Sequence, residues 1–206
     1  MDDKNFFLSI RKYINYNKWF YLGALLFLLT GIVIGIYVVL YMGDTYKSDI
    51  TEYFISFTKD FSSMNVNNKL ILFESIKNNG LLIIAIFIMG IIIVGIPIIL
   101  IINLIKGFTI GFSAGLIMNS MGLKGGLFVL LGVIPQNIFY IGALLFISVF
   151  SADMALNKLR NKFVKTSYPS KDNYKYIYIL VMSFSMILLG AVIESYITPY
   201  IIKYII

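Results

Sequence analysis

Few side chains in this chain could do chemistry from within its long apolar runs. Glu194 is the only acid in the interior of such a run, and Gln136 and Asn137 follow Pro135 inside another. Polar groups in apolar surroundings need protein partners or a water-filled cavity. We therefore consider two interpretations of these residues, a structural hydrogen-bond network and a transport or partner site.

The residue types that most catalytic sites require are missing from the sequence. The chain has no Cys and no His, which excludes disulfides, Cys/His zinc sites and Cys-His or Ser-His nucleophile pairs. It also lacks a P-loop, so ATP hydrolysis by that route is excluded. We expect no catalytic residues, no cofactor and no metal site, and hence a protein that is not an enzyme.

The composition is that of a membrane protein. Hydrophobic residues make up 59% of the chain and charged residues 13%, whereas ordinary globular domains are about 25% charged. Apolar runs such as Trp19 to Met42 match the roughly 20 residues that cross a bilayer. The predicted fold class is an all-α integral membrane protein, a bundle of about five transmembrane helices.

The net charge of +7 does not indicate nucleic-acid binding. A nucleic-acid reader gathers Lys and Arg on one solvated face, whereas the basic residues here lie between the apolar runs. Their placement is better explained by the retention of Lys and Arg on the cytoplasmic side. The expected surroundings are a lipid bilayer and no nucleic acid.

A short cytoplasmic N-terminal segment, residues 1–18, precedes one predicted membrane domain, residues 19–206. Lys106 ends the second predicted span, and Gly95 and Pro97 predict a kink within it.

The third predicted span, residues 107–122, is short, because 16 residues rise only about 24 Å. It is either a thin span or a re-entrant loop. A fourth crossing is needed if the N-terminus and the basic loop 151–173 are both cytoplasmic, which favours a span. The predicted spans are 19–42, 80–105, 107–122, 125–150 and 174–198.

Residues 43–79 form the predicted outer loop, because their acidic and basic residues are balanced. The resulting topology has the N-terminus inside and the C-terminus outside. Aromatic residues at helical spacing predict an amphipathic helix in the loop, followed by a second short helix. This outer surface either lies on the membrane or docks a partner domain through Tyr53, Phe54, Phe57 and Phe61.

Glycines four residues apart form two strips. Gly31 and Gly35 are one pair, and Gly107, Gly111 and Gly115 form the other strip. Small residues at this spacing let a second helix backbone approach closely in lipid. The strips indicate close packing either within the chain or in a homo-oligomer.

Four motifs stand out between residues 78 and 200: Asn78-Asn79, Lys106-Gly107-Phe108-Thr109-Ile110-Gly111, Pro135-Gln136-Asn137, and Ala191-Val192-Ile193-Glu194 through Thr198-Pro199. Together they resemble stage II sporulation protein M and its wider membrane family. The N-terminal span and the outer loop agree in length only. Many relatives in the wider family carry Pro-His-Gly and a nearby Glu where this chain has Pro135-Gln136-Asn137 and Tyr140. This difference points to the sporulation branch and away from a role that depends on His.

The resemblance implies a multi-pass protein of the cell membrane, located at the sporulation septum of endospore formers. It would be a non-enzymatic scaffold that holds two wall hydrolases, stage II sporulation proteins D and P, during peptidoglycan remodelling and engulfment of the forespore. The wider family is also similar to membrane subunits of ATP-driven exporters. The alternative function is therefore a transporter subunit with a separate ATPase docked on the loop 151–173.

Overall fold

The computed structural model describes residues 15–63, 67–92, 94–164 and 173–205, without the side chains of residues 59–63, 161–164 and 173–177. Within these ranges the chain forms helices and no strands. Five helices are long and apolar enough to cross a membrane. The prediction of an all-α membrane bundle with five spans is confirmed.

Three spans are single helices and two are helices continued through a π-helical turn. The continuous pairs are α6 to α7 through η1, and α8 to α9 through η2. The elements are α2 (Lys18–Tyr41), α3 (Asp44–Ser63), α4 (Asn68–Ile91), α5 (Gly95–Met121), α6 (Leu123–Phe128), η1 (Val129–Val133), α7 (Ile134–Val164), α8 (Asn173–Val192), η2 (Ile193–Ile197) and α9 (Thr198–Ile205).

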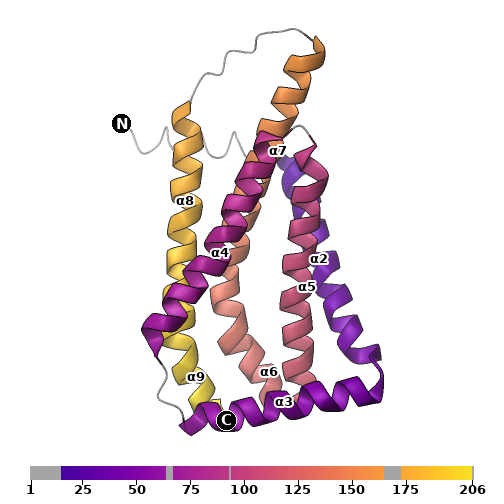
Figure 1. Cartoon of the computed structure of the whole chain (residues 1–206), viewed down its shortest axis with the longest axis vertical. Coiled ribbons are helices and arrows are strands. Elements are labelled where there is room, and N and C mark those ends of the chain that lie inside the picture. Colours follow the sequence, from indigo (N-terminus) through magenta and orange to yellow (C-terminus); the bar gives the residue numbers. More distant parts are fainter. Residues whose placement is uncertain (1–14, 64–66, 93, 165–172, 206) are drawn as a thin grey trace.

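The bundle has two distinct ends (Figure 1). At one end α3 lies crosswise, near α6, α9 and the C-terminus; we call this the α3 end. The opposite end holds Lys18, Lys158 and Arg160, and we call it the basic end. Lys158 Nζ donates a 3.1 Å hydrogen bond to Ile91 O, so the turn between α4 and α5 also lies at the basic end.

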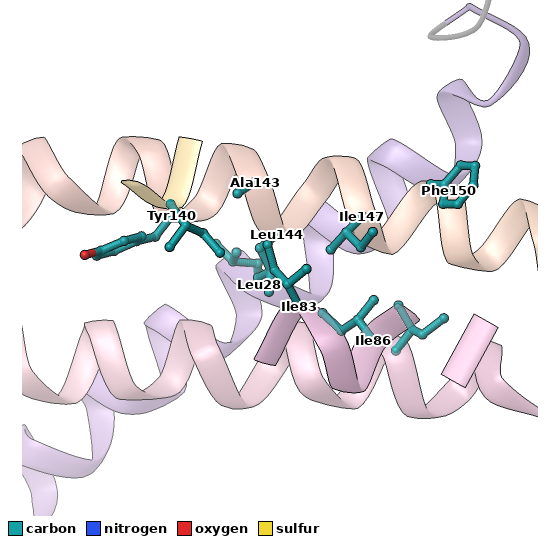
Figure 2. Packing of buried hydrophobic residues seen from close by; sticks show 10 residues of the cluster. Leu28, Ile83, Ile86, Tyr140, Ala143, Leu144, Ile147 and Phe150 are labelled. Carbon is teal, nitrogen blue, oxygen red and sulfur yellow. The ribbon is translucent and has the colours of Figure 1, made fainter. Parts of the chain in front are cut away.

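The span that contains α7 is the centre of the bundle, since 56% of its apolar window is buried against 17–28% in the other four spans. Its side chains meet those of α2, α4, α5 and α8 in one apolar core. Figure 2 shows this core along α7, with Tyr140 at one end of the row and its hydroxyl directed away from the other side chains. The core consists of Leu28, Ile83, Ile86, Ile99, Tyr140, Ala143, Leu144, Ile147, Phe150 and Ile187.

The two glycine strips lie against each other in the α2–α5 pair. A Cβ atom added at Gly107 would meet Leu28 O, and one added at Gly111 would meet Ile32 O. A Cβ atom added at Gly31 would meet Leu104 O, and one at Gly35 would meet Phe108 O. Each helix therefore uses its glycines to admit the backbone of the other, as small residues do in membranes, and the packing is within the chain.

The boundary between the second and third spans was predicted wrongly. The helix breaks after Ile91 and resumes at Gly95, whereas the predicted boundary was Lys106. Pro97 lies in the first turn of α5, where its missing N–H costs no helical hydrogen bond. The third span is therefore neither thin nor re-entrant, because α5 has 27 residues.

Helices also extend into the predicted loops. The last third of the predicted outer loop 43–79 belongs to α4, which begins at Asn68. The predicted basic loop begins as helix, because α7 continues to Val164, and the predicted break at Thr198-Pro199 is continuous helix to Ile205. The helix expected in the cytoplasmic segment 1–18 lies mostly outside the described residues.

Candidate functional site

Lys106 lies deep within the bundle. A helix rises 1.5 Å per residue, which places Lys106 about 17 Å from the Gly95 end of α5 and about 22 Å from the Met121 end. Both distances exceed half of the roughly 30 Å hydrocarbon core. Lys106 is thus an intramembrane cation rather than the end of a span.

Two uncharged groups hold the Lys106 ammonium. Its Nζ donates a 2.9 Å hydrogen bond to Asn79 Oδ1 on α4 and lies 5.5 Å from the centroid of the Tyr140 ring. A cation within about 6 Å of an aromatic face is attracted by the negative face of the ring. Three spans therefore meet at this side chain.

Glu194, in the π-helix η2, contacts the hydroxyl of Tyr140. The Tyr140 hydroxyl donates a 2.6 Å hydrogen bond to Glu194 Oε2, a short distance typical of bonds to a charged acceptor. Glu194 is not at the membrane surface, because the helix runs on for 11 residues to Ile205, about 17 Å. Tyr140 therefore contacts both the cation and the anion of the cluster.

Lys106 and Glu194 line a pocket of about 500 Å³ between α4, α5 and η2. Its rim is formed by exposed residues nearer the α3 end, Leu70, Glu74, Asn78 and Thr109, whereas Ser75, Asn79, Lys106 and Glu194 are buried or half-buried. Glu74 also lies 3.8 Å from Lys77 Nζ as an exposed ion pair. The pocket thus runs from the outer turns of α4 to the charged groups. We call Asn79, Lys106, Tyr140 and Glu194 the charged cluster.

Pro135 and Pro199 each follow a π-helical turn by two residues. The N–H of Ile134 bonds to Val129 O, and the N–H of Thr198 bonds to Ile193 O. These five-residue steps keep each helix continuous beside a proline, which cannot donate a backbone hydrogen bond. The wider turns therefore replace the breaks that the prolines suggest.

Gln136 and Asn137 are held by different partners. Thr198 Oγ1 donates a 2.6 Å hydrogen bond to Gln136 Oε1, which joins α7 to α9. Asn137 Nδ2 donates at 2.8 Å to Val133 O, one turn back in its own helix. The carbonyl that Pro135 leaves without a helical donor is Leu131 O, and the Asn137 amide bonds to Val133 O rather than to it. Both amides have structural partners.

A second polar contact lies nearer the basic end. Asn103 is fully buried, and its Nδ2 donates 2.8 Å hydrogen bonds to Ile99 O and to Ser148 Oγ. This pair joins α5 to α7. An amide bonded to a hydroxyl on a facing helix is a common form of adhesion between membrane helices.

The α3 helix presents different faces to the bundle and to the surroundings. Phe54 packs on Phe128 of α6 with ring centroids 6.4 Å apart, and Thr58 is buried. Tyr46 and Tyr53 are 72% and 74% exposed and lie two turns apart, and Phe57 is 51% exposed. Of the four aromatic residues predicted to bind a partner, Phe54 is therefore turned inward. Phe61 lies in α3, but its side chain is outside the described part.

The sequence missed the residues that join Glu194 to the rest of the bundle. Lys106 was predicted as a boundary, so Glu194 was expected to have no basic residue within another span. Lys106 is in fact in the same cluster, although it is 88 positions away in the sequence. Tyr140 was noted only as a difference from relatives. The available signal was a single charged residue, Lys106, in the 27 residues that form α5.

The chain was compared with protein families, curated proteins and solved structures. The family model described as stage II sporulation protein M matches residues 24–199, most of the chain. The match includes α3 and the charged cluster, and it extends further toward the N-terminus than the resemblance over residues 78–200. Neither a curated protein nor a solved structure matches.

Proposed function

Since this chain belongs to the stage II sporulation protein M family, and is therefore a sporulation-related membrane protein, we propose that it is a non-enzymatic scaffold at the sporulation septum. In this role it holds the peptidoglycan hydrolases known as stage II sporulation proteins D and P while the forespore is engulfed. The N-terminus and the basic end lie in the cytoplasm, and the α3 end faces the wall.

The observation that supports this role is the position of α3 across one end of the five-helix bundle. Phe54 anchors the helix on Phe128, and Tyr46 and Tyr53 remain exposed on its other side. Tyrosines at an interface contribute large apolar contact area together with a hydrogen-bonding hydroxyl. A helix that packs on the bundle through one face and exposes tyrosines on the other is suited to hold a partner close to the membrane surface.

The alternative is a transporter subunit that works with a separate ATPase, and the intramembrane charges are the observation that favours it, since such residues often mark substrate pathways. The pocket, however, is closed toward the basic end by the apolar core, in which Leu28, Ile83, Ile86, Leu144 and Ile147 are at most 5% exposed. This arrangement holds no polar path from one end to the other through that core. The scaffold is therefore the better supported function.

The two functions are distinguished by what copurifies with the chain. The full-length protein, tagged at its C-terminus, would be cross-linked in sporulating cells and purified in mild detergent. Recovery of the two wall hydrolases supports the scaffold. Stoichiometric recovery of an ATPase without hydrolases would overturn it in favour of the transporter.

A further inference from the structure

The charged cluster carries one positive and one negative group that do not neutralise each other by direct contact. The two residues are described in full, and no ion pair within 4.0 Å joins Lys106 to Glu194. Each contacts uncharged partners instead. Lys106 contacts the Asn79 amide and the Tyr140 ring, and Glu194 contacts the Tyr140 hydroxyl. Both charges line the same pocket.

From this arrangement we propose that the pocket binds a zwitterionic ligand, with an anionic group on Lys106 and an ammonium group on Glu194. A ligand with only a negative charge would be attracted by Lys106 but repelled by Glu194. A ligand with only a positive charge would be attracted by Glu194 but repelled by Lys106. These interactions are strong because they take place in surroundings of low dielectric constant. A ligand with both charges satisfies both groups and adds no net charge to the membrane interior.

The spacing of the two groups sets the length of the ligand. Tyr140 contacts both groups, and Lys106 and Glu194 are not within ion-pair distance of each other. A ligand whose two charges are several bonds apart can reach both. An α-amino acid carries its ammonium and carboxylate on one carbon and is the shortest ligand of this class. An ω-amino acid or the end of a peptide side chain has a suitable length, and a volume of about 500 Å³ lies in the range of small-molecule sites.

The ligand enters from the α3 end. The rim residues Leu70, Glu74 and Asn78 belong to the first three turns of α4, and the apolar core closes the opposite side. Tyr140 marks the boundary, because its ring belongs to the core and its hydroxyl points away from it (Figure 2). The site is thus a blind pocket with its charges at the bottom.

This chemistry has two natural sources. One is a dissolved zwitterion on the α3 side of the membrane, and the other is the head group of an ethanolamine lipid, which carries a primary ammonium and a phosphate. The site is independent of the proposed scaffold role, because it lies among α4, α5 and η2 and uses no residue of α3.

Calorimetric titration of the full-length chain in phosphatidylglycerol nanodiscs tests the proposal. The probes are glycine, 6-aminohexanoate, its N-acetyl derivative, which has only the negative charge, and its amide, which has only the positive charge. We expect 6-aminohexanoate to bind about thirtyfold more tightly than its N-acetyl derivative or its amide, as expected when one partner of a desolvated charge pair is lost. We also expect it to bind more tightly than glycine, whose two charges share one carbon.

Two variants assign the binding to the pocket. Lys106→Met should abolish binding. Lys124→Met is the control, because it removes an exposed lysine of α6, and it should leave binding unchanged. Glu194→Gln keeps the shape of the side chain and should remove the preference for 6-aminohexanoate over its N-acetyl derivative. The change in preference between the two probes in Glu194→Gln can be measured even if Lys106→Met fails to fold.

A further titration in nanodiscs that contain phosphatidylethanolamine identifies the source. Weaker binding of 6-aminohexanoate than in phosphatidylcholine nanodiscs supports the lipid head group, and equal binding supports a dissolved ligand. The proposal is overturned if wild-type protein binds no probe, if the N-acetyl derivative binds as tightly as 6-aminohexanoate, or if Glu194→Gln leaves the preference unchanged.

Discussion

The Tyr140 hydroxyl donates a 2.6 Å hydrogen bond to Glu194, and this bond joins the central helix α7 to the π-helical turn η2. Gly190 makes room for it, since a Cβ atom there would lie 2.6 Å from Cε1 of the Tyr140 ring. The same ring faces Lys106 at 5.5 Å. Tyr140 is therefore the residue through which the two intramembrane charges are coupled.

Replacing Tyr140 with Phe should destabilise the protein. The variant keeps the ring beside Lys106 but removes the hydrogen bond to Glu194, and a bond to a charged group contributes about 1.5–3 kcal/mol. Thermal unfolding in mild detergent measures the effect. Tyr204→Phe is the matched control, because Tyr204 is 94% exposed; equal melting temperatures for the two variants would contradict the assignment.

Glu194→Gln should be tolerated better than Glu194→Leu. Gln retains an oxygen that accepts the hydrogen bond from Tyr140, whereas Leu leaves that hydroxyl unpaired at a cost of about 1–3 kcal/mol. The amounts of folded protein in membranes, and the melting temperatures after extraction, should follow the order wild type, Gln, Leu. The reverse order of Gln and Leu would show that Glu194 is not held through this bond.

Lys106 and Glu194 should be energetically coupled. Removing one charge leaves the other unpaired in the membrane interior. Lys106→Met and Glu194→Gln should therefore each lower the free energy of unfolding more in the wild-type background than when the other substitution is already present. A double-mutant cycle on the free energy of unfolding should give a coupling of about 0.5–3 kcal/mol. Additive effects would mean that the two charges act independently.

Gly111→Ala should destabilise the α2–α5 pair. The new Cβ atom would meet Ile32 O, and overpacking of this kind costs roughly 1–3 kcal/mol. The control is Gly23→Ala in α2, where nothing lies within 4 Å of an added Cβ atom. Unfolding in detergent should separate the two variants, and unchanged stability of Gly111→Ala would place this strip on the lipid side.

The number of spans, their helical nature and the glycine strips were predictable from local sequence. Runs of about 20 apolar residues and glycines at a spacing of four depend only on neighbouring positions. The helix break at residues 92–94 was not predictable in the same way, because apolar residues continue from Leu81 to Ile105 and the first charge after them, Lys106, resembles a boundary.

The charged cluster could not be predicted because its members come from four spans. Asn79 and Lys106 are 27 positions apart, and Tyr140 and Glu194 are 54 positions apart. A single sequence contains no signal for such pairing. A π-helical turn likewise depends on tertiary contacts, here the hydrogen bond between Thr198 and Gln136, and the prolines alone suggested breaks.

The orientation of the chain can be tested on its own cysteine-free background. A cysteine in place of Ser48, exposed on α3, should react with an impermeant thiol reagent in intact cells. A cysteine in place of Asn157, exposed at the basic end of α7, should react only after the cells are permeabilised. The opposite pattern would place the α3 end in the cytoplasm.

The most direct test of the scaffold is the amount of the two wall hydrolases recovered with the chain from sporulating cells, for a variant in which Tyr46 and Tyr53 are both replaced by Ser. These side chains are exposed on α3, so the fold should be unaffected. The account predicts that hydrolase recovery falls sharply and engulfment stops, whereas Tyr204→Ser, at the same end, leaves both unchanged. Undiminished recovery of both hydrolases with the double variant would contradict the proposed role of α3.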